Sequence, residues 1–294
     1  FDALQDETEP PGDEPPGEAT IRYPMDYPTG EGMIDRALAR FAATPLEKVV
    51  LSRVCEVQRP ERIALVPALA RLLARYPECF VFLFEPRPLH AFFGATPELL
   101  IQMEGARYES MGLAGSIQRG ADPAEDDRLA AALLASAKDR REHELVTLAL
   151  RARLALVSSE MDIPAEPTIY RLGNIQHLYT PVHGVLANPR GVLPMVDLLH
   201  PTPALGGTPR NIALPFIREV EPVPRGWYAA PVGWIDQNMD GTFAVAIRSA
   251  VVQRNLAWLY AGAGIVADSV AEQEWEETGW KFRPMQQALG VEAR

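Results

Sequence analysis

The sequence predicts an α+β fold in which packed, mainly antiparallel β-sheets are flanked by helices. Strand-like segments follow one another directly at several points, whereas a parallel sheet would require strict alternation of strand and helix. The chain of 294 residues is 47% apolar, which is enough to bury a large core. No apolar run approaches the roughly 20 residues of a membrane span. We therefore expect a cytoplasmic protein with no membrane partner.

The composition narrows the classes of partner. The formal net charge is −11, so no nucleic-acid partner is expected, because phosphate binding requires a basic face. An acidic protein that binds an anion must do so with local cations, a metal ion or backbone dipoles. The two cysteines, Cys55 and Cys79, are too few for a disulfide scaffold and agree with a reducing compartment.

Two regions are expected along the chain. Residues 1–20 are rich in Asp, Glu, Pro and Gly, and they lack the apolar surface that ordering requires. We interpret them as a disordered, acidic, Pro-rich linker, and residues 21–294 as one folded domain. The chain starts at Phe1 without a methionine, which indicates the cut edge of a longer polypeptide.

Hydrophobic periodicity and turn residues give the elements of the first part of the chain. They are a helix at 33–41, a strand at 46–57, a helix at 67–76, a buried strand at 79–85 and two strands in 90–105 with a turn at 94–97. The segment LAGSIQRG at 113–120 is then expected to be a glycine-containing loop.

The second part contains the longest helical pattern. The expected elements are one helix at 122–158, extended chain at 168–186, short helices at 195–200 and 212–220, and strands at 228–236, 242–251 and 255–260. The last segment, GAGIVADSVAEQEWEETGWK at 262–281, is expected to be a glycine-rich turn followed by a helix. Such a turn offers backbone N–H groups to an anion.

Two pairs of carboxylates recur at a spacing of three on expected helices. Asp139 and Glu142 form one pair, and Glu274 and Glu277 form the other, so each pair shares a helix face. Four carboxylates brought to one point require a counter-cation, and Mg²⁺ is the divalent ion that prefers oxygen ligands and also binds substrate anions. The alternative is a solvated helix face with local salt bridges, for example to Lys138.

Lys48 and Glu98 are charged residues at the starts of apolar strands. Burial lowers the pKa of a lysine and raises that of a glutamate, so the two residues are candidates for a general base and a general acid. The alternative for both is an ordinary position at the end of a strand in water. Arg248, inside the strand VAIRSAVV, needs an anionic partner, which is either a protein carboxylate or a substrate. His177 and His200 each stand near a Pro-containing turn and are structural or catalytic.

Nine blocks in one order resemble the chorismate-utilising enzymes, and among them the isochorismate synthases of menaquinone and siderophore pathways. The blocks are KVVLSR, GATPELL, LAGSIQRG, KDRREHELV, LLHPTPALGG, PVGWID, AIRSA, AGAGIV and EWEETGWK. The resemblance covers about residues 48–289 and implies the aminodeoxychorismate synthase-like fold shared with anthranilate synthase component I. It also implies that residues 21–294 are a chorismate-binding catalytic domain that lacks part of the family's usual N-terminal region.

The resemblance assigns a role to each matching residue. Glu142 and Glu277 would bind Mg²⁺ directly, with Asp139 and Glu274 helping through water. Lys48 would activate water for attack at C2 of chorismate, and Glu98 would protonate the departing C4 hydroxyl. The residues implied to contact the substrate are Gly115, Ser116, His177, Ala204, Leu205, Arg248, Gly262, Gly264 and Lys281.

The same resemblance bears on the subclass. Relatives that add ammonia usually have another residue at the position of Lys48, often glutamine, and a polar residue near Ala204 and Leu205, so water is the implied nucleophile. Two alternatives stay open, a salicylate synthase that also eliminates pyruvate and a truncated chorismate-binding fragment without activity. The protein is expected to be a monomer or a weak dimer.

Overall fold

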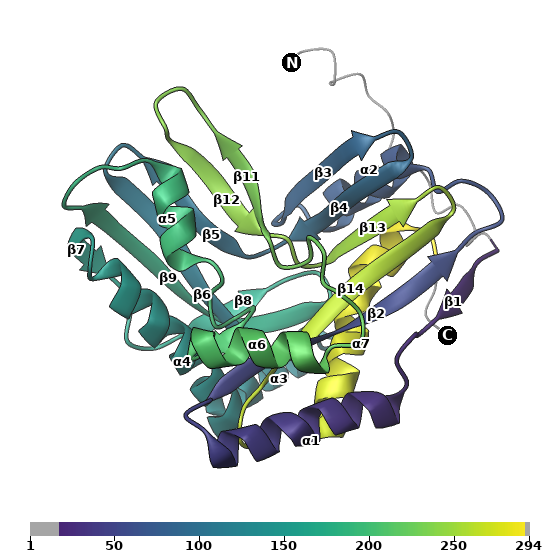
Figure 1. Ribbon diagram of the computed structural model, residues 1–294, viewed down its shortest axis with the longest axis horizontal. Coiled ribbons are helices and arrows are strands. Elements are labelled where there is room, and N and C mark those ends of the chain that lie inside the picture. Colours follow the sequence, from purple (N-terminus) through teal and green to yellow (C-terminus); the bar gives the residue numbers. More distant parts are fainter. Residues whose placement is uncertain (1–17, 292–294) are drawn as a thin grey trace.

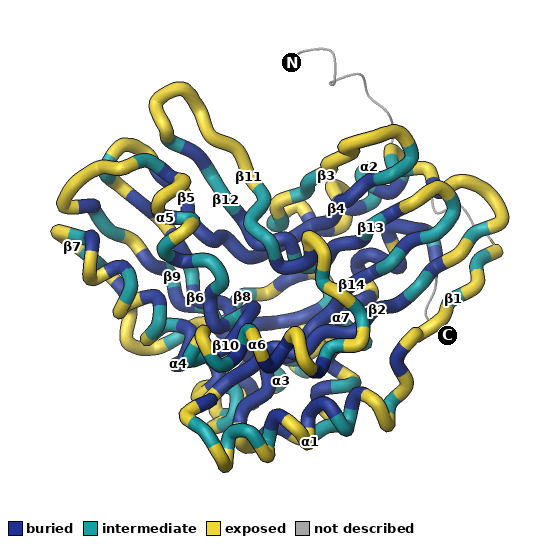
Figure 2. Tube along the Cα trace, viewed as in Figure 1, coloured by how far each residue is buried: buried dark blue, intermediate teal, exposed yellow. Residues whose placement is uncertain are grey.

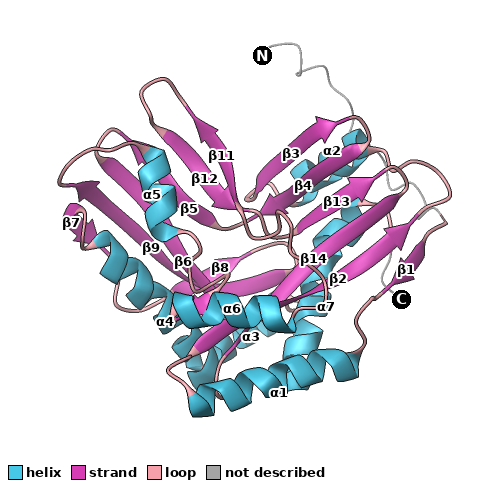
Figure 3. Ribbon diagram, in the orientation of Figure 1, coloured by secondary structure: helices cyan, strands magenta, loops and turns pink. Residues whose placement is uncertain are grey.

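The computed structural model describes residues 18–291, which contain seven helices and two seven-stranded antiparallel sheets (Figure 1). The sheets lie side by side, with their edge strands β11 and β3 next to each other (Figure 3), and residues of both strands line one pocket. The predicted α+β class of packed antiparallel sheets with flanking helices is therefore confirmed. Residues 1–17 of the expected linker lie outside the described range, and β1 begins at Thr20.

The first sheet has the strand order β1-β2-β14-β13-β4-β3, with β10 paired to β2. Its strands are β1 (Thr20–Arg22), β2 (Lys48–Gln58), β14 (Leu256–Ile265), β13 (Ser249–Gln253), β4 (His90–Thr96), β3 (Phe80–Arg87) and β10 (Gly207–Thr208). The longest register joins β2 to β14, from Gln58 opposite Leu256 to Val49 opposite Ile265. This pairing places the start of β2 beside the end of β14.

The second sheet has the order β11-β12-β5-β6-β9-β7, with β8 paired to β9. Its strands are β11 (Pro231–Ile235), β12 (Gly241–Val245), β5 (Leu99–Glu104), β6 (Arg107–Gln118), β9 (Ile175–Leu186), β7 (Ser158–Asp162) and β8 (Thr168–Arg171). The segment LAGSIQ belongs to β6, so the expected loop is wrong. A bulge between Ala114 and Ser116 interrupts its register with β9.

Within residues 18–291 the chain passes between the sheets at four places, and two of these places lie next to each other. One of the two is Pro97–Glu98, between β4 and β5, and the other is residues 246–248, between β12 and β13. Backbone hydrogen bonds tie these places together, from Val245 N–H to the Glu98 carbonyl (3.0 Å) and from Ala95 N–H to the Arg248 carbonyl (3.1 Å). These bonds fix the backbone of Glu98 and of Arg248 where the sheets meet.

Each sheet is covered by its own helices. Those of the first sheet are α1 (Tyr27–Ala43), α2 (Leu65–Arg75), α6 (Arg210–Val220) and α7 (Ala271–Ala288), and those of the second are α3 (Pro123–Ala135), α4 (Ala137–Leu154) and α5 (Val192–Leu199). Burial is most continuous along β2, β14 and the inward face of α7 (Figure 2). Among the described residues no helix is long and apolar enough to cross a membrane.

Further element predictions were wrong. The expected strand at 242–251 is two strands, β12 in the second sheet and β13 in the first, so Arg248 lies in the connection between them and not inside a strand. The single helix at 122–158 is two helices, because Ser136 leaves the helical conformation and caps α4 through its hydroxyl, and Ser158 already belongs to β7. Gly262 and Gly264 lie inside β14 and not in a turn. The apolar strand at 79–85 is the edge strand β3, and it is largely exposed because only β4 pairs with it.

Candidate active site

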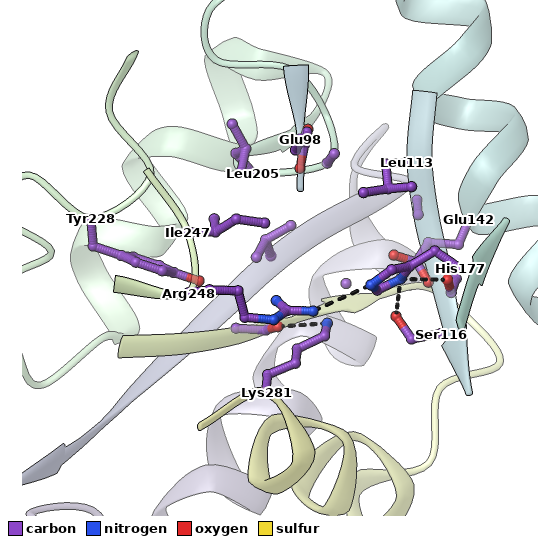
Figure 4. A pocket seen from close by; sticks show the side chains of 16 residues that line it. Glu98, Leu113, Ser116, Glu142, His177, Leu205, Tyr228, Ile247, Arg248 and Lys281 are labelled. Carbon is purple, nitrogen blue, oxygen red and sulfur yellow. Dashed lines mark hydrogen bonds between the residues drawn. The ribbon is translucent and has the colours of Figure 1, made fainter. Parts of the chain in front are cut away.

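A small pocket, with a volume of about 50 Å³, lies where the two sheets meet (Figure 4). Eleven residues singled out from the sequence line it, namely Glu98, Gly115, Ser116, Glu142, His177, Ala204, Leu205, Arg248, Gly262, Gly264 and Lys281. In Figure 4, Glu98 and Leu205 lie across the pocket from Arg248 and Lys281. His200, the other histidine considered, is not in this lining.

The β6 bulge positions His177. Gly115 has a φ of +74°, a conformation that glycine adopts without strain, and it shifts the register so that Ser116 stands opposite His177 on β9. The Arg248 guanidinium donates to Nε2 of His177 (3.3 Å), so the ring proton is on Nδ1, which donates to the Gly115 carbonyl (3.1 Å). Burial, reinforced by the Arg248 and Lys281 charges, keeps the pKa of His177 well below its usual range. The imidazole is therefore a neutral, fixed wall of the pocket.

Arg248 is a buried cation without a carboxylate partner. Within residues 18–291 it makes no ion pair, and its hydrogen bond to His177 engages a neutral ring. Burial lowers the pKa of Arg248 because the charged form loses hydration. A buried guanidinium requires an anion for stability, so this part of the pocket is suited to a carboxylate or phosphate ligand.

Arg248→Met is expected to raise the KM of a carboxylate substrate about ten- to a hundredfold, the usual value of a hydrogen bond to a charged group. The folded protein should not lose stability, because the substitution removes an unpaired buried charge. Arg225→Met is the control, since Arg225 is partly buried, with 17% of its side chain exposed, but donates to Glu221 through Nε (2.9 Å). It should lower the melting temperature. An Arg248→Met protein with unchanged KM and a melting temperature as low as the control would show that Arg248 is structural.

The glycines of β14 permit close approach of side chains to the backbone. A Cβ on Gly264 would lie 2.0 Å from Oε1 of Glu142 and 3.0 Å from Cε of Lys48. A Cβ on Gly262 would lie 2.9 Å from the Tyr228 hydroxyl. Any larger residue would therefore displace the charged groups beside the strand. The Gly262 carbonyl accepts a hydrogen bond from Nζ of Lys281 (2.9 Å).

Glu98 is the carboxyl group of the pocket that most resembles a proton donor. Its residue is 4% exposed, and burial raises its pKa to about 7, although the charges of Lys48, Arg248 and Lys281 act in the opposite direction. A carboxyl with such a pKa is partly protonated at neutral pH. It can therefore donate a proton to a leaving group in the pocket.

Lys48 is fully buried behind the pocket wall, at the first residue of β2. Its Nζ lies 3.1 Å from Oε1 of Glu142, but at an angle that makes no hydrogen bond. Both Glu142 and Gly264, which Lys48 contacts, line the pocket. The side chain of Glu142 thus separates the amine from a ligand in the pocket, and burial keeps bulk water away from the amine.

Four carboxylates stand on α4 and α7, which an ion pair between Lys138 and Glu274 joins. Glu142 and Asp139 come from α4, and Glu274 and Glu277 come from α7. Their partners are lysines: Lys48 with Glu142, Lys281 with Glu277, and Lys138 with Glu274 (2.7 Å) and Asp139 (3.7 Å). These are all three lysines of the chain.

The carboxylates have the chemistry of a site for a hard divalent cation. Both carboxylate oxygens of Glu274 are buried without a hydrogen-bond partner, and the residue is only 2% exposed. Burial and the neighbouring charges of Glu277 and Glu142 raise the pKa of Glu274 to about 7. Across residues 18–291 no three His, Cys, Asp or Glu side chains are already arranged around one metal position. Carboxylate oxygens are the ligands that Mg²⁺ prefers, and in this structure the three lysines pair with these oxygens.

Sequence reasoning did not single out Lys138 as a site residue, nor five residues of the pocket lining, namely Val50, Leu113, Ala114, Tyr228 and Ile247. Tyr228 lines the pocket and packs face to face on Tyr260, and burial raises its pKa to about 12. Lys138 was noted only as a possible salt-bridge partner on its own helix. Neither position has a local sequence signal, because each reaches the site through tertiary packing.

Comparison with known proteins agrees with this geometry. The sequence profile of a family described as "Chorismate binding enzyme" matches residues 4–290. Isochorismate synthase MenF of Bacillus subtilis (strain 168) is 41% identical over 261 residues, which are 89% of this chain and 55% of that protein. Isochorismate synthase EntC of Escherichia coli (strain K12) is 40% identical over 263 residues, which are 90% of this chain and 67% of that protein.

A solved structure gives the same result for the fold. DhbC from Bacillus anthracis superposes with a TM-score of 0.90 at 36% sequence identity, covering 94% of this chain and 75% of that one. The chain thus spans between about half and three quarters of the length of these relatives.

Proposed function

The chain belongs to the family of chorismate-binding enzymes, and we propose that residues 21–294 carry an isochorismate synthase. The reaction adds water at C2 of chorismate and removes the hydroxyl at C4. One pocket carries the proposal. It is lined by Glu98, a buried carboxyl with a pKa of about 7, and by Arg248, a buried arginine that has no carboxylate partner among residues 18–291. Lys48, a buried lysine, lies behind its wall. An acid, an anion site and a base are the groups that this reaction needs.

The charges of the pocket suit a dianionic substrate. Arg248 and Lys281 lie on the same side and are proposed to bind the enolpyruvyl carboxylate. Gly115, Ser116, Gly262 and Gly264 are proposed to offer N–H groups to the substrate carboxylates. The neutral imidazole of His177 is proposed to line the ring, where it adds no charge to compete with the guanidinium.

Glu98 is proposed as the general acid, and Lys48 as the general base. Hydroxide is a poor leaving group, so protonation of the C4 oxygen by Glu98 lowers the barrier to its departure. Lys48 takes a proton from the water that attacks C2. Its ammonium faces Glu142 in this structure, so this ion pair has to open and the amine has to be neutral before it accepts a proton.

Glu142 and Glu277 are proposed to hold Mg²⁺ directly, with Asp139 and Glu274 around them, and the ion would neutralise the ring carboxylate of chorismate. The protein's own residues restrict the nucleophile. Ala204 and Leu205 give the pocket an apolar wall without a side chain that would bind ammonia. The similar proteins of Bacillus subtilis and Escherichia coli are both named isochorismate synthase, which supports isochorismate as the product.

The direct test is the product formed from chorismate. Purified protein with chorismate and excess Mg²⁺ is expected to give isochorismate, separated by liquid chromatography, with no change when ammonium is added. Anthranilate that appears only with ammonium would contradict the proposal. Fluorescent salicylate would show that pyruvate elimination follows, and an absence of turnover would indicate a chorismate-binding fragment.

A further inference from the structure

Lys138 differs from the other two lysines in what it touches. Lys281 lines the pocket and Lys48 contacts two of its lining residues, whereas Lys138 and both of its carboxylate partners, Glu274 and Asp139, lie outside the lining. Its Nζ joins α4 to α7, at 2.7 Å from Oε1 of Glu274 and 3.7 Å from Oδ1 of Asp139. Binding of the substrate therefore does not explain why a lysine stands here.

The carboxylates beside Lys138 are among the four proposed to hold the metal ion. Its Nζ pairs with Asp139 of α4 and Glu274 of α7, and Glu142 lies one turn further along α4 on the same helix face. These residues cannot hold a divalent ion and keep an ammonium in their midst, because the two cations would repel each other at short range. The Lys138 side chain is 19% exposed, so it has a route toward solvent.

We propose that Lys138 is the resident cation of this carboxylate cluster, that it occupies the place of the divalent ion in the metal-free protein, and that its withdrawal admits the ion. The inference rests on the proposed magnesium-dependent function and adds a positioning residue to it. Lys138 holds Glu274 and Asp139 in place until the ion arrives, and it opposes binding of the ion when substrate is absent.

The test is the affinity of the chorismate-free protein for Mg²⁺, measured by titration calorimetry. Lys138→Met keeps the length of the side chain and removes its charge, and it should bind Mg²⁺ at least tenfold more tightly than wild type. Lys138→Arg keeps the charge and should stay within threefold of wild type. The matched control is Arg141→Met, one turn along α4, where the exposed Arg141 pairs with Glu47 and Glu144 outside the cluster. It should change the affinity less than twofold.

Equal or weaker binding by Lys138→Met would overturn the inference, as would a tightening that Arg141→Met reproduces. The shift of the melting temperature by saturating Mg²⁺ is a second readout, and it should be larger in Lys138→Met than in wild type. If the methionine variant does not fold, Lys138→Gln serves in its place, because its amide is polar but carries no charge. Failure of the proposed function is read separately, from the product of wild-type protein with chorismate and excess Mg²⁺.

Discussion

Replacement of Lys48 with arginine is expected to lower kcat for isochorismate formation by about 10²–10⁴-fold, the usual contribution of a positioned proton-transfer group. A guanidinium keeps the positive charge beside Glu142 but does not release a proton at any pH that the protein tolerates. Lys48→Met, which is similar in length and uncharged, should lose as much. The measurement is the steady-state rate of product formation, together with calorimetric titration of chorismate in the presence of Mg²⁺.

The pair of Lys48 variants separates two roles of the lysine. If the amine is the base, both variants lose turnover while the affinity of Lys48→Arg for chorismate stays within a few-fold of wild type. If the positive charge alone matters, Lys48→Arg remains active and Lys48→Met does not. An active arginine variant would therefore show that the base has been assigned to the wrong residue.

The Glu98→Gln variant is expected to lose about 10²–10⁴-fold in kcat/KM, because an amide cannot protonate the departing C4 oxygen. In wild type the acid form of Glu98 is required, and burial raises its pKa to about 7, so kcat/KM should fall as the pH rises through about 7. Glu98→Asp keeps a carboxyl group and should retain a descending limb at a different pH. A wild-type profile that stays flat up to pH 9, with an active Glu98→Gln variant, would rule out Glu98 as the acid.

The stability of Glu98→Gln gives a check that does not depend on turnover. The pKa of Glu98 in the folded protein lies above its ordinary value of 4.5, so its favourable contribution is complete below pH 4.5 and is lost as the pH rises to about 7. At pH 8 wild type buries a charge that the glutamine variant lacks. The variant should then be more stable by at most about 3 kcal/mol, with little difference at pH 4.5.

The fold could be predicted where a local pattern decides the structure. The strand that starts at Lys48 and the helices at 67–76 and 212–220 have clear periodicity, and the structure has them within two residues. The strand at 79–85 has an equally apolar sequence, but whether a strand is central or at an edge depends on which strands pair with it. Its sequence does not contain that information, and its prediction as a buried strand was wrong.

Two kinds of site residue could be predicted from the sequence. They are charged residues within apolar segments and residues in the blocks that resemble the family. A charged residue within an apolar sequence, such as Arg248, indicated a buried cation, although Arg248 lies between two strands and not inside one. A spacing of three indicated the carboxylate pairs. That the chain changes sheet at Glu98 and at Arg248 is visible only in the structure. It depends on how the β4–β5 and β12–β13 connections hydrogen-bond to each other between the two sheets. The contact of Lys138 with α7 likewise depends on how α4 and α7 pack, so its local sequence gave no reason to separate it from an ordinary surface lysine.

The origin of the new hydroxyl group tests the central claim most directly. Water activated by Lys48 attacks C2, and the original C4 hydroxyl leaves, so a reaction in water enriched with oxygen-18 should place one heavy oxygen at C2 of isochorismate. Mass spectrometry of the product formed in a single turnover, with fragmentation to locate the label, reads this outcome. Isochorismate with no heavy oxygen would mean that the hydroxyl migrates within the substrate, and it would contradict the assignment of Lys48 as the base that activates water.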